Sequence, residues 1–177
     1  MTFANSEFST MTVSEQTDPT PRKTREGDRE LNYGFLQNFV GHYLRLAYEA
    51  SYDDFVKRLG DDQLKPGYFS MLVIIRNNHG ITQRELGESI GRDKSSVAKA
   101  LRTLEDRGLI YRERVENDRR NYASFLTAKG LETYERMEVK AQEHTKHLDA
   151  VIGPERRDAV FGALRDLINL QHGSSDS

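Results

Sequence analysis

Residues 81–109 of the chain read ITQRELGESIGRDKSSVAKALRTLEDRGL, and this pattern predicts two short helices joined by a tight turn. Thr82 and Glu85 have the spacing of a capping box, which indicates that the first helix begins there. Asp93 is placed to cap the second helix, and Gly108 suits a left-handed exit from it. Two capped short helices, the second basic on its outer side, are the layout of a helix-turn-helix.

The residues after this pair predict a β-hairpin followed by two helices. Residues 109–115 and 122–126 are rich in aromatic and branched side chains, and the polar stretch 116–121 separates them. Thr127 can cap a long helix, and Gly153-Pro154 can restart the chain in a last one. The inward positions of the long helix recur at roughly heptad spacing and are Leu131, Tyr134, Met137, Ala141, His144 and Leu148.

The residues before the pair predict two more helices. From Leu31 apolar residues recur at every fourth position, so we expect one helix with a broad apolar face to begin there. Residues 61–62 and then Lys65-Pro66-Gly67 interrupt it, and Pro66 suits the first turn of the next helix. Residues 68–75 are apolar nearly all round, which predicts a central, buried helix.

Composition narrows the class of protein. The 177 residues suit one domain, but only 36% are hydrophobic and 31% are charged, so we expect part of the surface to be buried in a partner. The absence of cysteine excludes disulfides, thiolate metal sites and thiol redox sensing. No run approaches the ~20 apolar residues of a membrane helix and no signal pattern opens the chain, so we expect a cytoplasmic protein without membrane contact.

The charge is unevenly distributed along the chain. The formal net charge is −2, yet residues 84–130 hold 11 basic and 8 acidic side chains and are the net positive part. A local basic face on an acidic body can bind phosphates. The sequence has no nucleophile-elbow, phosphate-loop, zinc-protease or dinucleotide-binding motif, so we expect neither an enzyme nor a cofactor site. His144 and His147 could share a metal, but no suitably spaced carboxylate–histidine set accompanies them, so we expect no metal site.

At this point the chain resembles the MarR family of bacterial winged-helix regulators over about residues 31–170. The resemblance rests on ITQREL at 81–86, on residues 97–110 ending in EDRGLI, and on DRR at 118–120 followed by LTAKG at 126–130. It implies a mainly α fold with a small β-hairpin wing, in which a winged helix-turn-helix is joined to N- and C-terminal dimerisation helices. The boundaries we expect are a disordered tail at 1–30, a dimerisation helix and connection at 31–65, the DNA-binding lobe at 66–127, dimerisation helices at 128–172 and a disordered end at 173–177.

The second helix of the pair is the expected DNA reader. A helix enters the major groove of B-DNA, where short hydroxyls approach base edges and long cations reach phosphates. By resemblance, Asp118 holds a wing arginine in place, and we favour Arg120 over Arg119 for insertion into the minor groove. An ordinary solvated face is the alternative for the cations. The predicted DNA-binding residues are Thr82, Gln83, Lys94, Ser95, Ser96, Lys99, Arg102, Arg114, Asp118, Arg119 and Arg120.

The resemblance also implies a homodimer, a pseudo-palindromic double-stranded operator and a small aromatic or phenolic effector that releases a repressor from DNA. The alternative is a winged-helix module for protein assembly or architectural DNA binding without a small ligand. Core or dimer packing is the competing role for the aromatic residues of the first helix. The predicted ligand-binding residues are Tyr33, Phe39, His42, Tyr43, Tyr68, Phe69 and Arg76.

Overall fold

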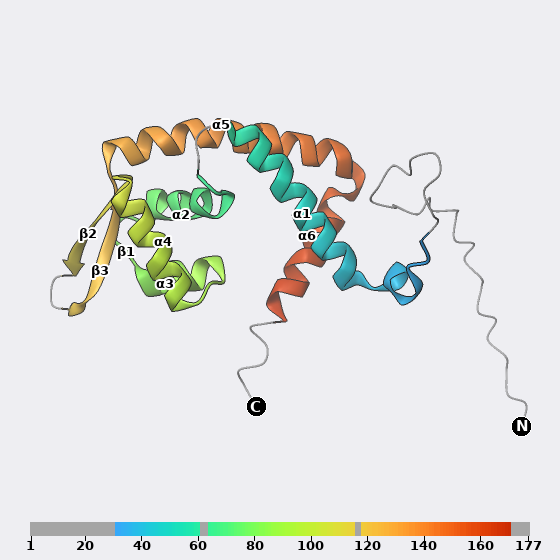
Figure 1. Cartoon of the computed structure of the whole chain (residues 1–177), viewed down its shortest axis with the longest axis horizontal. Helices are drawn as coiled ribbons and strands as arrows, with labels where there is room; N and C mark the ends of the chain where they lie inside the picture. The colour runs from blue at the N-terminus through green and yellow to red at the C-terminus, as the bar shows by residue number, and fades with distance from the viewer. Residues whose placement is uncertain (1–30, 61–63, 116–117, 171–177) are drawn as a thin grey trace, which may run out of the picture. The chain divides into compact units, whose positions relative to one another are not determined.

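The computed structural model describes residues 31–60, 64–115 and 118–170 (Figure 1). The tails predicted at 1–30 and 173–177 lie outside the described residues. The chain divides into two units, Met1–Phe39 and Val40–Ser177. In the first unit the described structure is a short 3₁₀ helix, η1, over Gly34–Asn38.

The prediction of one continuous helix from Leu31 is wrong. Gly34 has a positive φ of 51°, and its amide donates a 2.8 Å hydrogen bond to the side chain of Asn32. Phe39 is extended, with φ −94° and ψ 100°. Since a side chain that bonds the local backbone and a left-handed glycine both oppose helix, the apolar periodicity becomes helical only from Val40.

The second unit holds the remaining elements, and the predicted mainly α fold with a hairpin wing is confirmed (Figure 1). Its elements are α1 (Val40–Leu59), α2 (Pro66–Asn77), β1 (Ile81–Thr82), α3 (Gln83–Ile90), α4 (Lys94–Asp106), β2 (Ile110–Val115), β3 (Asp118–Leu126), α5 (Ala128–Ile152) and α6 (Pro154–Asn169).

The sheet is antiparallel and has the strand order β1-β3-β2. Strand β1 was not predicted, because its two residues acquire their pairing from β3, where Ile81 faces Ser124 and Thr82 faces Ala123. The expected tip at 116–121 is too long, since β3 already begins at Asp118. Polar residues can continue these strands because no apolar face is required of a projecting hairpin.

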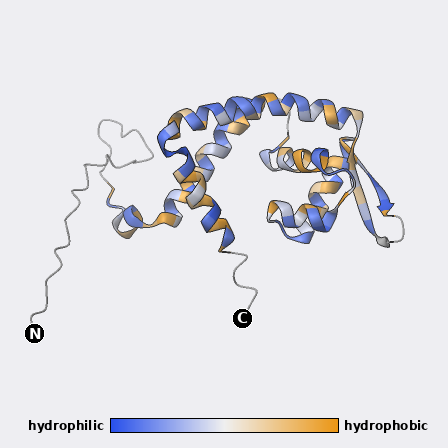
Figure 2. Cartoon of the chain, turned by 180° about the vertical axis from the view of Figure 1, so that it is seen from behind, coloured by the Kyte–Doolittle hydropathy of each residue, from blue (hydrophilic) through white to orange (hydrophobic). Residues whose placement is uncertain are grey.

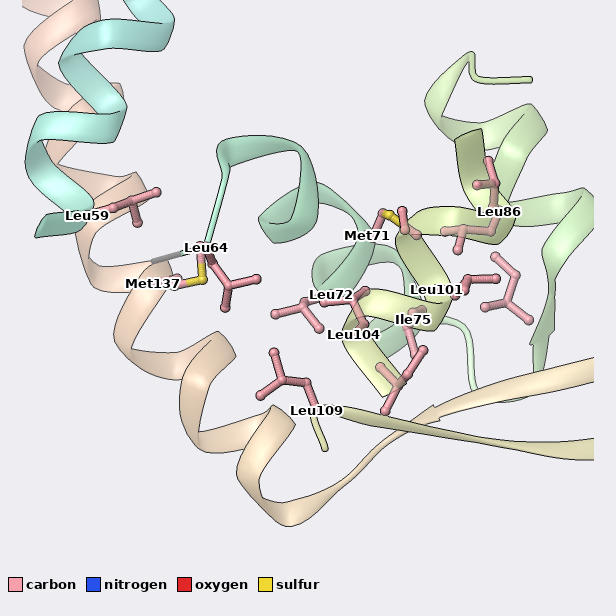
Figure 3. Packing of buried hydrophobic residues seen from close by; sticks show 14 of the residues in the cluster. Leu59, Leu64, Met71, Leu72, Ile75, Leu86, Leu101, Leu104, Leu109 and Met137 are labelled. Atoms are coloured by element: carbon pink, nitrogen blue, oxygen red, sulfur yellow. The ribbon is translucent and has the colours of Figure 1, made fainter. Parts of the chain in front are cut away.

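The core is formed by the end of α1, by α2, α3, α4 and the start of β2, and by Met137 of α5 (Figure 3). The inward stripe predicted for α4 is confirmed, since Val97, Leu101 and Leu104 are fully buried. Helix α2 is buried on one side only. Met71, Leu72 and Ile75 are buried, but Tyr68, Phe69, Val73 and Ile74 are half-buried, so the expectation of burial nearly all round is too strong.

Figure 2 shows hydrophobic residues, in orange, along both α1 and α6. Several of their apolar side chains are exposed. On α6, Phe161, Leu164, Leu167 and Ile168 are all exposed, and on α1 the same holds for Val40 and Leu44. Besides its buried core, the chain therefore carries an exposed apolar surface on these two helices. None of the described helices is both long and apolar enough to cross a membrane.

Candidate nucleic-acid interface and adjoining cavity

Helix α3 begins with the predicted capping box. The Glu85 amide donates a 3.3 Å hydrogen bond to Thr82 Oγ1, and the Thr82 amide donates a 2.9 Å bond to Glu85 Oε2. Thr82 Oγ1 also donates to the same carboxylate oxygen at 2.7 Å. The bonds from the Thr82 hydroxyl and amide lower the pKa of Glu85. The start of the helix-turn-helix is therefore set locally, and Thr82 is occupied in forming it.

The turn between α3 and α4 is held tightly by two glycines. Gly91 adopts the left-handed conformation with φ 62°. The Arg92 amide donates a 3.0 Å bond to the Gly87 carbonyl. A Cβ on Gly87 would lie 3.2 Å from the Arg92 carbonyl oxygen, so a larger side chain would press α3 away from the turn. This close approach determines how α4 is presented next to α3.

Asp93 caps α4 with both carboxylate oxygens. Its Oδ1 accepts from the Ser95 and Ser96 amides at 3.0 and 2.9 Å. The Ser95 hydroxyl also donates to Oδ1, at 2.5 Å, and the Ser96 hydroxyl donates to Oδ2, at 2.6 Å. These bonds hold the pKa of Asp93 well below its usual range. Both serine hydroxyls thus donate their protons within the cap. Toward a DNA base, each hydroxyl oxygen can act only as a hydrogen-bond acceptor.

The outer side of α4 presents cations. Lys94, Lys99 and Arg102 are exposed, while the helix buries the opposite stripe. The Gln83 side chain donates a 3.1 Å bond to the Lys94 carbonyl and ties the first turns of α3 and α4 together. Three of the predicted phosphate-binding cations therefore share one exposed helix face, with the Gln83 amide next to its start.

The wing is attached to α4 by an ion pair. The Arg112 guanidinium on β2 donates to Glu105 Oε2 on α4, with Nε at 3.0 Å. Arg114 is exposed, with its guanidinium carbon 5.9 Å from the centre of the Tyr122 ring. Arg112 therefore holds the strand in place, whereas the exposed Arg114 stays a predicted phosphate contact.

The wing tip is placed only in part. Asp118, Arg119 and Arg120 lie in β3, but their side chains fall outside the described part of the chain. The proposed ion pair of Asp118 and the insertion of Arg120 stay predictions.

The end of α4 is bound to the start of α5. Thr127 Oγ1 donates to the Gly108 carbonyl at 2.7 Å, the Thr127 amide donates to the Leu109 carbonyl at 3.0 Å, and Lys129 Nζ donates to the Arg107 carbonyl at 2.8 Å. Gly130 passes so close to Leu109 that a Cβ would lie 2.8 Å from its carbonyl carbon. The LTAKG stretch therefore fixes the end of α4 to the long helix α5.

A cavity of about 730 Å³ lies next to α4. Helices α1 and α5 contribute aromatic and polar side chains to its wall, and residues 65–71 with the α3–α4 turn and α4 contribute the rest. Its aromatic lining consists of Tyr48, Tyr52, Phe55 and Tyr68, and its cationic lining of Lys65, Arg92 and Lys99. Rings and cations in one concave site suit an aromatic anion.

The cavity draws on few of the predicted ligand residues. Tyr68 lines it, whereas His42, Tyr43, Phe69 and Arg76 do not, and Tyr33 and Phe39 belong to the first unit. Phe69 packs instead against the Phe55 ring, at 5.7 Å between centroids, and the Tyr134 ring, at 6.2 Å. His42 and Tyr43 contact each other near the start of α1, 5.7 Å apart.

Sequence reasoning missed the lining residues that α1 contributes. Tyr48, Ser51, Tyr52 and Phe55 line the cavity and have the spacing of one helix face. The shared face is visible in the sequence, about one and a half to three turns beyond Tyr43, but periodicity alone does not tell which turns of that face line a cavity. His144, predicted only as part of an apolar stripe, lies in the same wall.

A capped helix pair with a basic outer face and a β-hairpin beside it defines a winged helix-turn-helix DNA-binding protein. The model of the MarR family matches residues 64–122. A Thauera aromatica protein, whose proposed role is transcriptional regulation of the hcr operon, is 30% identical over 139 residues, which are 78% of this chain and 84% of that protein. The chain belongs to the MarR family of DNA-binding transcriptional regulators.

Solved structures of similar proteins agree with this assignment. The transcriptional repressor CouR bound to a 23-mer DNA duplex is 32% identical, with a TM-score of 0.74, over 79% of this chain and 99% of that one. CouR bound to p-coumaroyl-CoA is 31% identical, with a TM-score of 0.72, over 78% of this chain and 98% of that one.

Proposed function

We propose that this protein is a homodimeric repressor that leaves its operator when an aromatic acid or its CoA thioester occupies the cavity next to α4. The observation that carries the proposal is that Lys99 and Ser96 belong both to the reading helix and to the cavity wall. A ligand in the cavity therefore touches the element that reads DNA.

The proposed DNA contacts follow from the exposed face of α4. Lys94, Lys99 and Arg102 bind phosphates, and Ser95 and Ser96 accept hydrogen bonds from base edges. Gln83, whose amide has a second hydrogen to donate, contacts the DNA phosphate backbone at the start of α3, and Thr82 acts by capping this helix. Arg114 and the DRR tip follow the minor groove. A two-fold pair of such lobes reads half-sites about 34 Å apart, so the operator is pseudo-palindromic.

Homodimerisation is supported by the uncovered apolar face. Phe161, Leu164, Leu167 and Ile168 on α6 are exposed in the single subunit, as are Val40 and Leu44 on α1. Burying such a face against a second copy gains roughly 25 cal/mol per Å² of apolar surface. A two-fold axis would use the same patch on both subunits.

The effector class is supported by the lining of the cavity and by the ligand of the similar repressor CouR. Four aromatic side chains accompany three cations in this wall, and CouR, at 31% identity, has been solved with p-coumaroyl-CoA bound. A tenfold loss of DNA affinity requires only about 1.4 kcal/mol of differential binding of the effector to the two states. By linkage, DNA then weakens effector binding by the same factor.

The test is fluorescence anisotropy with the DNA upstream of the coding region, titrated in the presence of p-coumaroyl-CoA, benzoate or CoA alone. We expect the thioester or the acid to raise the dissociation constant at least tenfold. Tyr68→Ala should reduce this response, whereas Arg76→Ala, at an exposed position outside the cavity, should retain it. Equal loss of response in both variants, or no response of the unmodified protein to any aromatic compound, would refute the proposal.

A further inference from the structure

His144 stands in the cavity wall with each ring nitrogen next to a polar partner on α1. Its Nδ1 is 2.7 Å from Asp54 Oδ2, and its Nε2 is 3.2 Å from Ser51 Oγ. The ring stacks on Phe55, with centroids 5.1 Å apart and an interplanar angle of 17°. The His144 side chain is 12% exposed, and both His144 and Ser51 line the cavity.

The partners of His144 determine which nitrogen carries the proton. Arg58 Nε donates to Asp54 Oδ2 at 2.6 Å. The hydrogen bonds from Arg58 and His144 lower the pKa of Asp54 to about 2, so Asp54 is an ionised acceptor. Nδ1 of His144 must therefore carry its hydrogen toward Asp54. In the neutral ring, Nε2 then holds a lone pair, and Ser51 is the donor that satisfies it.

Asp54, His144 and Ser51 are linked by hydrogen bonds in the same order as the catalytic triad of a serine hydrolase, but the oxyanion hole of such an enzyme is missing from the described residues around them. Ser51 lies in the middle of α1, Val40–Leu59, where backbone N–H groups are held in helical hydrogen bonds. The amides around Ser51 therefore do not supply the pair of donors that stabilises an oxyanion. What the geometry does supply is an oriented hydrogen-bond acceptor in the wall of an aromatic cavity.

We infer that the effector carries a hydroxyl group that donates to Nε2 of His144, and that this contact makes the cavity selective for hydroxylated aromatic ligands. The inference rests on the proposed function, because it specifies the chemistry of the same effector. The hydroxyl replaces Ser51 as the donor, while the ring of the ligand packs among the aromatic residues of the wall.

The expected selectivity is moderate, for a reason that the structure supplies. When a ligand lacks the hydroxyl, Ser51 can keep its bond to Nε2, so no buried acceptor is left unpaired. When the ligand carries the hydroxyl, the displaced Ser51 hydroxyl can turn to a backbone carbonyl one turn earlier on α1, so the complex gains one net hydrogen bond. The preference for the hydroxylated ligand is then about tenfold. Without the Ser51 hydroxyl, an unhydroxylated ligand would strand the acceptor, and the preference should rise by about a further tenfold.

Two substitutions should therefore act in opposite directions. Ser51→Ala should increase the ratio of affinities, and His144→Phe, which keeps a ring against Phe55 without an acceptor, should bring it to about one. Asp54→Asn should lower the ratio without altering the cavity wall, because Asp54 does not line it and acts by fixing the proton on Nδ1. Thermal melting of each variant establishes that it is folded before binding is compared.

The experiment is isothermal titration of the full chain with cinnamoyl-CoA, the three monohydroxycinnamoyl-CoA isomers and 4-methoxycinnamoyl-CoA, together with the free acids. We expect one hydroxylated isomer to bind about tenfold more tightly than the unsubstituted and methoxy compounds. Equal affinities for the hydroxylated and unhydroxylated compounds would overturn the inference, as would an affinity ratio that persists in His144→Phe. Neither result would contradict the proposal of an aromatic effector. If none of these compounds binds, the proposed effector class itself is refuted, and this inference with it.

Discussion

Replacing Gly130 with alanine should destabilise the protein, although alanine is the better helix former. Gly130 lies in the first turn of α5 and is buried against Leu109. An added Cβ would be 2.8 Å from the Leu109 carbonyl carbon and closer to its oxygen, where ordinary contact begins at 3.4 Å. That oxygen cannot easily turn away, because it accepts the 3.0 Å bond from the Thr127 amide.

The size of the stability loss follows from the hydrogen bonds that must lengthen or break. For α5 to retreat, the bonds from the Thr127 amide, the Thr127 hydroxyl and Lys129 Nζ must all lengthen or break, at about 1 kcal/mol each. Alanine regains at most about 1 kcal/mol through helix propensity. The net loss in free energy of unfolding is therefore about 2 kcal/mol or more. Because the same contacts fix the end of α4, DNA affinity should fall as well.

Urea unfolding followed by circular dichroism measures the loss, and anisotropy measures DNA binding at a temperature where the variant is folded. Gly162→Ala is the matched control, since Gly162 is also helical and nothing lies within 4 Å of the added Cβ. That variant should be as stable as the parent or up to about 1 kcal/mol more stable. If Gly130→Ala matched this control, the close approach of α5 to Leu109 would not be a constraint on the fold.

Three further predictions concern the interface and its caps. Lys99→Ala and Arg102→Ala should each weaken DNA binding without changing sequence preference. Each should also reduce the slope of log affinity against log salt by about one per lost phosphate contact in each subunit, which titrations between about 50 and 200 mM salt would measure. Asp93→Ala should lower the urea midpoint of unfolding above pH 3.8, the ordinary pKa of the Asp93 carboxyl. The difference in midpoint between variant and parent should close as the pH falls toward the lowered pKa of the folded state, and unfolding curves at several pH values would show this. Peroxide should not release DNA, because the chain has no cysteine, and a reversible, thiol-dependent loss of binding would contradict this.

The helix-turn-helix was predictable because its determinants are local. The capping box at Thr82 and Glu85, the cap at Asp93 and the left-handed Gly108 all act within a few residues of chain, and all are found in the structure. The inward stripe of α4 follows from helical periodicity alone. The same local reasoning failed at Leu31, where periodicity was read without the competing Asn32 turn.

The cavity, by contrast, required tertiary structure. Its wall combines residues of α1, α2, α4 and α5, and no pattern within one of these helices tells which turn of α1 faces the others. His144 shows why most clearly. In sequence it is one position in an apolar stripe, and its partner Asp54 is 90 residues away. A hydrogen-bonding role depends on which groups are brought within 3 Å, and for His144 only the packing of α5 against α1 decides that.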